Sequence, residues 1–206
     1  MEIIAHRGLT VGPKLKTKNP LHEAVALGFG IEFDVRDSPE GLIMAHDPWE
    51  KDSMLLKTFL QRIPDRGTLA VNIKSCGLAP AIKEVLELVG VKESRCFFFD
   101  MSVPDHLQFL KHKLPSYARL SEFETSGDLV SLSAGVWLDA FRTRWWDEYL
   151  IKDLLEKGLK VCVVSPDLHR RDHQACWEYL KNCGLYRHPQ VSLCTDYAIA
   201  AKDYFL

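Results

Sequence analysis

The strongest constraint on the fold is an alternation of short apolar runs with longer amphipathic stretches, repeated eight times along 206 residues. The apolar runs, which predict strands, cover 3–5, 31–36, 69–73, 96–99, 117–120, 136–140, 160–164 and 191–194. The amphipathic stretches, which predict helices, cover 21–29, 55–63, 79–88, 105–112, 126–133, 148–157, 172–182 and 198–204. Such alternation favours a parallel sheet covered by helices. Eight such units without an evident edge strand predict that the α/β fold is a single (β/α)8 TIM barrel with short loops.

Composition and charge limit the domain organisation and the functions that this chain can have. No linker or low-complexity segment interrupts the series, so we expect residues 1–206 to form a single domain. The net charge of −2 gives no overall attraction to nucleic acid, so a phosphate must be bound by a local cluster. No secretory leader opens the sequence, no apolar run is long enough to span a membrane, and the six cysteines lack CxxC spacing. We therefore expect a cytoplasmic protein with reduced cysteines; its oligomeric state stays open.

Polar residues interrupt two of the apolar runs. Glu32 and Asp34 alternate with apolar residues, so both face the same side of their strand, about 7 Å apart. Asn72 and Lys74 repeat this spacing on the next strand. Buried charges of this kind need partners. One explanation is an ion pair of Lys74 with Glu32 or Asp34, and the other is a hard cation such as Mg²⁺ or Ca²⁺ held by oxygen ligands.

Further polar residues stand at strand ends, where the active sites of such barrels lie. They are His6-Arg7-Gly8, Asp100, Asp139 and Thr195-Asp196. His46 follows the segment 42–45, which returns after a turn at Pro39-Glu40-Gly41, and it is a candidate acid or base together with His6. The other histidines are expected at the surface: His22, His106, His112, His169, His173 and His188.

Tryptophans and arginines gather in loops on the predicted active face. They are Trp49, Arg142, Arg144, Trp145 and Trp146. The tryptophans either pack under the loops or contact the alcohol part of a substrate whose phosphate the arginines attract.

Taken together, these residues resemble the signature of the glycerophosphodiester phosphodiesterase family. The strongest matches are His6-Arg7-Gly8, Asn19-Pro20, Gly30-Ile31-Glu32-Phe33-Asp34-Val35, Gly41 and His46-Asp47. Asn72-Ile73-Lys74 stands where the family has an acidic residue, any residue and lysine, and Thr195-Asp196-Tyr197 resembles its last strand.

The resemblance implies a barrel enzyme that cleaves a small-molecule phosphodiester. It implies that His6 and His46 form the acid–base pair and that Arg7 and Lys74 hold phosphate. Glu32 and Asp34 are implied as ligands of a divalent cation, with Asn72 in place of the third acidic ligand. Because Asn72 brings no charge, we expect Mg²⁺ or Ca²⁺ to be weakly bound.

The sequence departs from the family's pattern at two other places, and the second concerns the cover of the site. Lys18 stands where glutamate is usual, and the segment 47–68 is shorter than the family's insertion, which predicts an open site. Two alternatives remain. One is a related phospholipase D-type lyase that uses the same two histidines and releases a cyclic phosphate. The other is a degenerate barrel that binds phosphorylated ligands without turnover.

Overall fold

The structure is a computed structural model, and it describes residues 1–9, 19–48, 53–125 and 127–206. Its strands are β1 (Glu2–His6), β2 (Gly30–Ser38), β3 (Gly41–Met44), β4 (Leu69–Ile73), β5 (Cys96–Phe99), β6 (Tyr117–Leu120), β7 (Gly135–Leu138), β8 (Lys160–Val164) and β9 (Val191–Thr195). Its α-helices are α1 (Pro20–Ala26), α2 (Leu56–Leu60), α3 (Ala79–Val89), α4 (Val103–Lys111), α5 (Asp128–Leu132), α6 (Glu148–Glu156), α7 (Gln174–Asn182) and α8 (Ala198–Phe205). Short 3-10 helices are η1 (Glu93–Arg95), η2 (Pro166–His169) and η3 (Leu185–Arg187).

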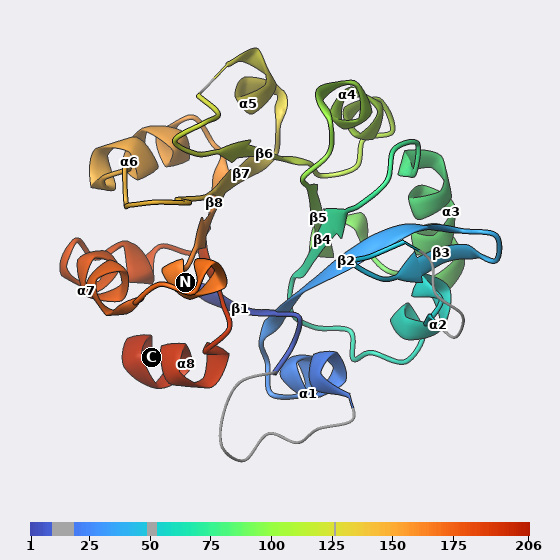
Figure 1. Cartoon of the computed structure of the whole chain (residues 1–206), viewed down its shortest axis with the longest axis horizontal. Helices are drawn as coiled ribbons and strands as arrows, with labels where there is room; N and C mark the ends of the chain where they lie inside the picture. The colour runs from blue at the N-terminus through green and yellow to red at the C-terminus, as the bar shows by residue number, and fades with distance from the viewer. Residues whose placement is uncertain (10–18, 49–52, 126) are drawn as a thin grey trace.

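The parallel strands run around a barrel in the order β5-β4-β2-β1-β9-β8-β7-β6, with the helices outside (Figure 1). A single bridge between Phe98 and Ser116 joins β5 to β6, and the Phe98 N–H donates to the Pro115 carbonyl over 2.9 Å. β3 pairs antiparallel with the far end of β2 and forms a hairpin. The predicted TIM barrel and the returning segment are therefore confirmed.

Helix ends differ from the predicted ranges for local reasons. The helix predicted for 21–29 ends at Ala26, because Gly28 adopts the left-handed conformation with a φ of +88°. The helix predicted for 55–63 ends at Leu60, shortly before Pro64, which disfavours helical backbone in the residue preceding it.

Apolar side chains fill the barrel interior beneath its carboxyl end. We call this cluster the barrel plug; its buried members are Ile4, Ala70, Phe97, Phe99, Tyr117, Trp137, Cys162, Val164 and Cys194. The rings of Phe97 and Tyr117 stack with centroids 3.9 Å apart, and those of Phe99 and Trp137 stack at 4.0 Å. A second, larger apolar layer lies between the strands and the helices. The plug gives any site at the mouth a rigid floor.

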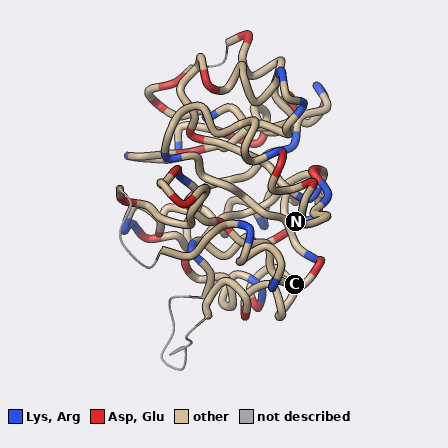
Figure 2. The backbone as a smooth tube through the Cα atoms, turned by 90° about the vertical axis from the view of Figure 1, so that its right-hand side faces the viewer, with Lys and Arg blue, Asp and Glu red and all other residues tan. Residues whose placement is uncertain are grey.

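The outer surface carries mixed charge. Basic and acidic segments are interspersed on the face seen in Figure 2, as expected for a net charge of −2. The six cysteines are free thiols; four are buried, Cys183 is partly exposed and Cys76 is exposed. None of the helices in the described ranges is long and apolar enough to cross a membrane.

Candidate active site

Strand alternation places a ring of polar residues directly above the barrel plug. On β7, for example, Trp137 belongs to the plug and Leu138 to the outer layer, so the next inward position is Asp139. The same parity on other strands brings inward His6, Glu32, Asp34, Asn72, Arg119 and Asp196. All these side chains surround the mouth at the carboxyl ends of the strands, where catalytic residues of such barrels lie.

One wall of the mouth is formed by β1, β2 and β4. Strand register sets His6 beside Glu32 and Asp34 beside Asn72. Glu32, Asp34 and Asn72 are all buried, at 2%, 7% and 8% exposed. Lys74 Nζ lies 3.2 Å from Asp34 Oδ1. The sequence therefore correctly predicted that these carboxylates face inward together, and the ion pair of Lys74 with Asp34 forms.

Arg7 approaches the same carboxylate from β1. Its Nη2 atom lies 3.5 Å from Asp34 Oδ2, so Asp34 is held between two cations. Arg7 has a φ of +54°, which is uncommon outside glycine, and Gly8 follows with a φ of +83°. A Cβ on Gly8 would stand 2.5 Å from the carbonyl carbon of Pro20, so only glycine allows the chain to turn here and keep Arg7 at the mouth.

His6 is oriented by a carboxylate from the last strand. Its Nδ1 atom lies 2.7 Å from Asp196 Oδ1, which leaves Nε2 facing Glu32 Oε2 at 3.7 Å. Burial by itself lowers the pKa of His6, but the hydrogen bond to Asp196 and the charges of Glu32 and Asp196 outweigh it, so the pKa is raised. Burial raises the pKa of Glu32 to about 7, although the charge of His6 opposes this. The pKa values of both side chains are therefore raised where they face each other.

Three buried oxygens on this wall accept no hydrogen bond from the described residues: Glu32 Oε2, Asp34 Oδ1 and Asn72 Oδ1. Carboxylate and amide oxygens are ligands that a hard cation prefers. No group of three or more His, Cys, Asp or Glu side chains in the described ranges is arranged to hold a metal. An ion at this wall would therefore depend on the amide of Asn72 and on water.

His46 stands on the lip of the same wall, just after β3. It shares a depression of about 250 Å³ with Arg7 and Asp34. Its side chain is half exposed, and its Nδ1 lies 2.9 Å from Asp47 Oδ1, itself exposed. The backbone carbonyl of His46 accepts from Arg36 Nη1 over 3.1 Å. The structure thus brings His46 beside Arg7 and Asp34, but with a less rigid support than that of His6.

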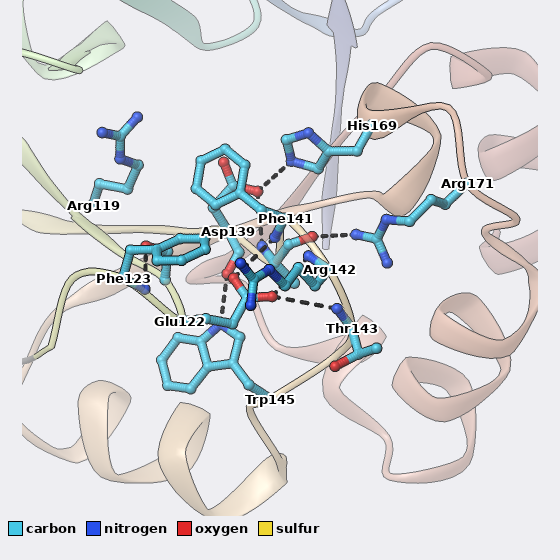
Figure 3. A network of polar contacts seen from close by, with 12 residues as sticks. Arg119, Glu122, Phe123, Asp139, Phe141, Arg142, Thr143, Trp145, His169 and Arg171 are labelled. Atoms are coloured by element: carbon cyan, nitrogen blue, oxygen red, sulfur yellow. Dashed lines mark hydrogen bonds and ion pairs between the residues drawn. The ribbon is translucent and has the colours of Figure 1, made fainter.

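The other side of the mouth carries a second polar group, which we call the far wall. It consists of Arg119, Asp139 and His169 (Figure 3), together with Asp100, which follows β5 and links the far wall to Asn72. Arg119 Nη1 donates to Asp100 Oδ1 over 2.9 Å, and His169 Nε2 lies 2.6 Å from Asp139 Oδ1. The sequence pointed to Asp100 and Asp139 as strand ends and missed Arg119. An arginine in the apolar run 117–120 was a signal that could have found it.

Two histidines expected at the surface make contacts that the sequence did not predict. His169 turns toward the mouth, because η2 folds back after β8 and Asp139 Oδ1 forms a hydrogen bond with His169 Nε2. His106 is 2% exposed, and its Nε2 lies 3.0 Å from the Ser133 hydroxyl between α4 and α5. The surface prediction for His106 was therefore wrong, because a helical position by itself does not say which face a neighbouring element covers. His169 remains partly exposed, at 23% of its side chain.

The loop arginines separate into two environments. Arg142 is exposed beside the mouth, where its guanidinium lies 4.9 Å from the Phe123 ring centroid. Arg144 instead lies 3.7 Å from the ring centroid of Tyr179 on α7 and donates to the Trp146 carbonyl. Arg144 therefore packs against the Tyr179 ring and does not contact the far wall.

The two loop tryptophans of the described residues differ in their exposure. Trp146 is buried beneath its loop, as the packing alternative predicted. Trp145 is 38% exposed, and its Nε1–H donates to the Asp139 carbonyl over 2.7 Å at the edge of the far wall (Figure 3). Trp49 and Lys18 lie outside the described residues.

Fold and mouth together define a class: a small (β/α)8 barrel with acids, bases and cations gathered at its carboxyl end. No protein-family profile matches the sequence, and no curated protein sequence is significantly similar to it. Similar solved structures include a glycerophosphodiester phosphodiesterase from Agrobacterium tumefaciens, with a TM-score of 0.69, 16% identity, and coverage of 99% of this chain and 98% of that one. Another is a phosphodiesterase from Oleispira antarctica in complex with its product sn-glycerol-3-phosphate, with a TM-score of 0.66, 19% identity, and coverage of 99% and 96%. At these identities the comparison establishes the shared fold.

Proposed function

We propose that this chain is a metal-assisted phosphodiesterase that cleaves a small glycerophosphodiester-like substrate, with His6 and His46 as its acid–base pair. The observation that carries the proposal is the meeting of His6, Arg7, Asp34 and Lys74 at one mouth of the barrel. The similarity to phosphodiesterase structures over nearly the whole chain supports the same activity.

Arg7 and Lys74 are suited to bind the phosphate. Asp34 holds both cations in place, so little side-chain freedom is lost when an anion reaches them. Their charges would neutralise the non-bridging oxygens as negative charge builds up in the transition state. The exposed guanidinium of Arg142 would attract an anionic substrate to the mouth.

Glu32, Asp34 and Asn72 would hold the divalent cation, Mg²⁺ or Ca²⁺. Glu32 Oε2 and Asn72 Oδ1 are buried and accept no hydrogen bond from the described residues, so they fit such an ion, while Asp34 Oδ1 already faces Lys74 Nζ at 3.2 Å. Asn72 leaves the site with only two carboxylates. When bound, the ion would supply further positive charge for the phosphate oxygens. Lys74 opposes its binding by repulsion, so we infer that the ion is held weakly.

His6 is placed to move a proton at Nε2, because Asp196 fixes its ring through Nδ1. His46 would handle the second proton from the other side of the shared depression. One histidine removes the proton of the attacking oxygen and the other protonates the departing alkoxide. The attacker is water in a hydrolase, or a neighbouring hydroxyl of the substrate in a lyase that releases a cyclic phosphate.

The test is an assay on several glycerophosphodiesters with Mg²⁺, with Ca²⁺ and with EDTA, in which ³¹P NMR follows the products. A phosphomonoester that forms only with metal is the expected result. Accumulation of a cyclic phosphate would indicate the lyase. Binding of phosphodiesters without any turnover would replace the proposal with the degenerate barrel. Full activity in EDTA would contradict the role of the metal.

A further inference from the structure

A hydrogen bond between Asn72 and Asp100 determines which way the Asn72 amide faces. Asn72 Nδ2 donates to Asp100 Oδ2 over 3.1 Å, from β4 to the residue that follows β5. A carboxylate oxygen accepts hydrogen bonds and donates none, so the contact requires the NH₂ group of the amide and not its carbonyl oxygen. The carbonyl oxygen of Asn72 therefore points away from Asp100.

Sheet order places the wall formed by β1, β2 and β4 on that other side of the amide. β4 lies between β5 and β2, and Asn72 stands beside Asp34 in the register of β4 and β2. Asn72 Oδ1 is buried and accepts no hydrogen bond from the described residues, and the same holds for Glu32 Oε2 on β2. The amide thus directs its oxygen, the atom that can bind a hard cation, toward the carboxylates of β2.

Asp100 is itself held in place from its other side. Its Oδ1 accepts from Arg119 Nη1 over 2.9 Å, and Arg119 Nε donates to Glu124 Oε2 over 2.5 Å. The backbone φ of Asp100 is +68°, a conformation that aspartate and asparagine adopt more readily than most residues other than glycine. Each oxygen of the carboxylate therefore has its own donor, and Asp100 keeps one orientation.

We propose that Asp100 is a positioning residue of the cation site, which fixes the carbonyl oxygen of Asn72 toward the ion without touching the ion itself. The inference rests on the proposed function, in which Glu32, Asp34 and Asn72 hold Mg²⁺ or Ca²⁺. Partners that orient the ligands of a metal in this way commonly set its affinity. A neutral amide is useful to a cation only through its oxygen, so its orientation matters more than that of a carboxylate, whose two oxygens are equivalent.

Asp100→Asn separates orientation from a mere tie between β4 and β5. Asparagine fits the same left-handed backbone, and Arg119 can only donate, so the oxygen of the new amide stays with Arg119. Its NH₂ group then faces Asn72, and the Asn72 amide must turn its carbonyl toward position 100 to keep the hydrogen bond. The tie between the strands is preserved, but the NH₂ group of Asn72 now faces the ion.

The test measures Mg²⁺ and Ca²⁺ binding to the metal-free protein by calorimetry. We expect Asp100→Asn to raise Kd by about 10-fold to 100-fold, the usual effect of losing a partner of a metal ligand. Asp65→Asn is the matched control, because Asp65 also pairs with an arginine, Arg95, but in the loop before β4 at the other end of the barrel. Its Kd should equal that of the wild type, and thermal unfolding in EDTA checks that each variant is folded.

The same substitution in an Asn72→Asp background tests the mechanism. There the new amide at position 100 donates to the new carboxylate at position 72, and either oxygen of that carboxylate can bind the ion. Asp100→Asn should therefore leave the affinity of Asn72→Asp unchanged or improve it. An equal loss in both backgrounds would overturn the proposal, because it would show an effect of charge or folding alone. If Asp100→Asn does not fold by itself, the comparison of Asn72→Asp with the double variant still decides.

Hydrolysis of glycerophosphodiesters, followed beside binding, separates this inference from the proposed function. Metal-dependent cleavage by the wild type, together with an unchanged Kd in Asp100→Asn, would remove only the role of Asp100. A wild type that binds neither ion and cleaves the diesters in EDTA would remove the metal and this inference, and leave a phosphodiesterase. A wild type that neither binds the ions nor cleaves the diesters would overturn both.

Discussion

Glu32→Gln tests the electrostatics of the β1–β2–β4 wall. Burial raises the pKa of Glu32 from 4.5 to about 7, so the folded protein holds this proton more tightly than the unfolded chain does. The protonated carboxyl therefore contributes to the free energy of unfolding at low pH, and this contribution is lost as the pH rises from about 4.5 to about 7. The difference between 7 and 4.5, at about 1.4 kcal/mol per pH unit, corresponds to about 3 kcal/mol. Glutamine carries no charge at either pH, so the variant avoids this loss.

The measurement is urea unfolding of both proteins in EDTA at pH 5 and at pH 8. At pH 5 the free energies of unfolding should be similar, and at pH 8 the variant should be more stable by up to about 3 kcal/mol. Glu84→Gln makes the same chemical change on the exposed surface of α3 and should show no such difference. An effect of Glu32→Gln that is equal at the two pH values would refute the reasoning, because it would show that the charge of Glu32 is not what the fold opposes.

The remaining predictions concern turnover, metal and substrate. His6→Ala and His46→Ala should each lower kcat by roughly 10²–10⁴-fold, the usual contribution of a positioned acid or base, and near-normal turnover in either variant would remove that histidine from the mechanism. Asn72→Asp should tighten Mg²⁺ or Ca²⁺ binding in calorimetry, because it adds a negative charge beside the buried oxygens of Glu32 and Asp34; an unchanged affinity would place Asn72 away from the ion. Arg142→Ala should raise KM for anionic diesters more than it lowers kcat, whereas Arg144→Ala should lower thermal stability and leave KM unchanged, since Arg144 packs on an aromatic ring. An unchanged KM in Arg142→Ala together with a raised KM in Arg144→Ala would show that Arg144, and not Arg142, attracts the substrate.

The sequence alone determined the architecture and one wall of the mouth. Alternation of apolar runs with amphipathic stretches is a local property, and it suffices to predict eight strand–helix units and a parallel barrel. The inward position of Glu32 and Asp34 follows from the same local rule, because side chains along a strand alternate between its two faces. His46 was a candidate acid or base from its place after the returning segment, and the resemblance to a known family implied the same role.

Only the tertiary structure decided the far wall. His169 meets Asp139 across 30 positions of sequence, and the contact depends on η2 folding back over the end of β9. His106 on α4 likewise contacts Ser133, which directly follows α5, and it is buried there. No pattern of neighbouring residues encodes such pairings, because they arise when separate elements pack against each other. The partners that orient each histidine, and with them the opposite walls of the mouth, therefore became visible only in three dimensions.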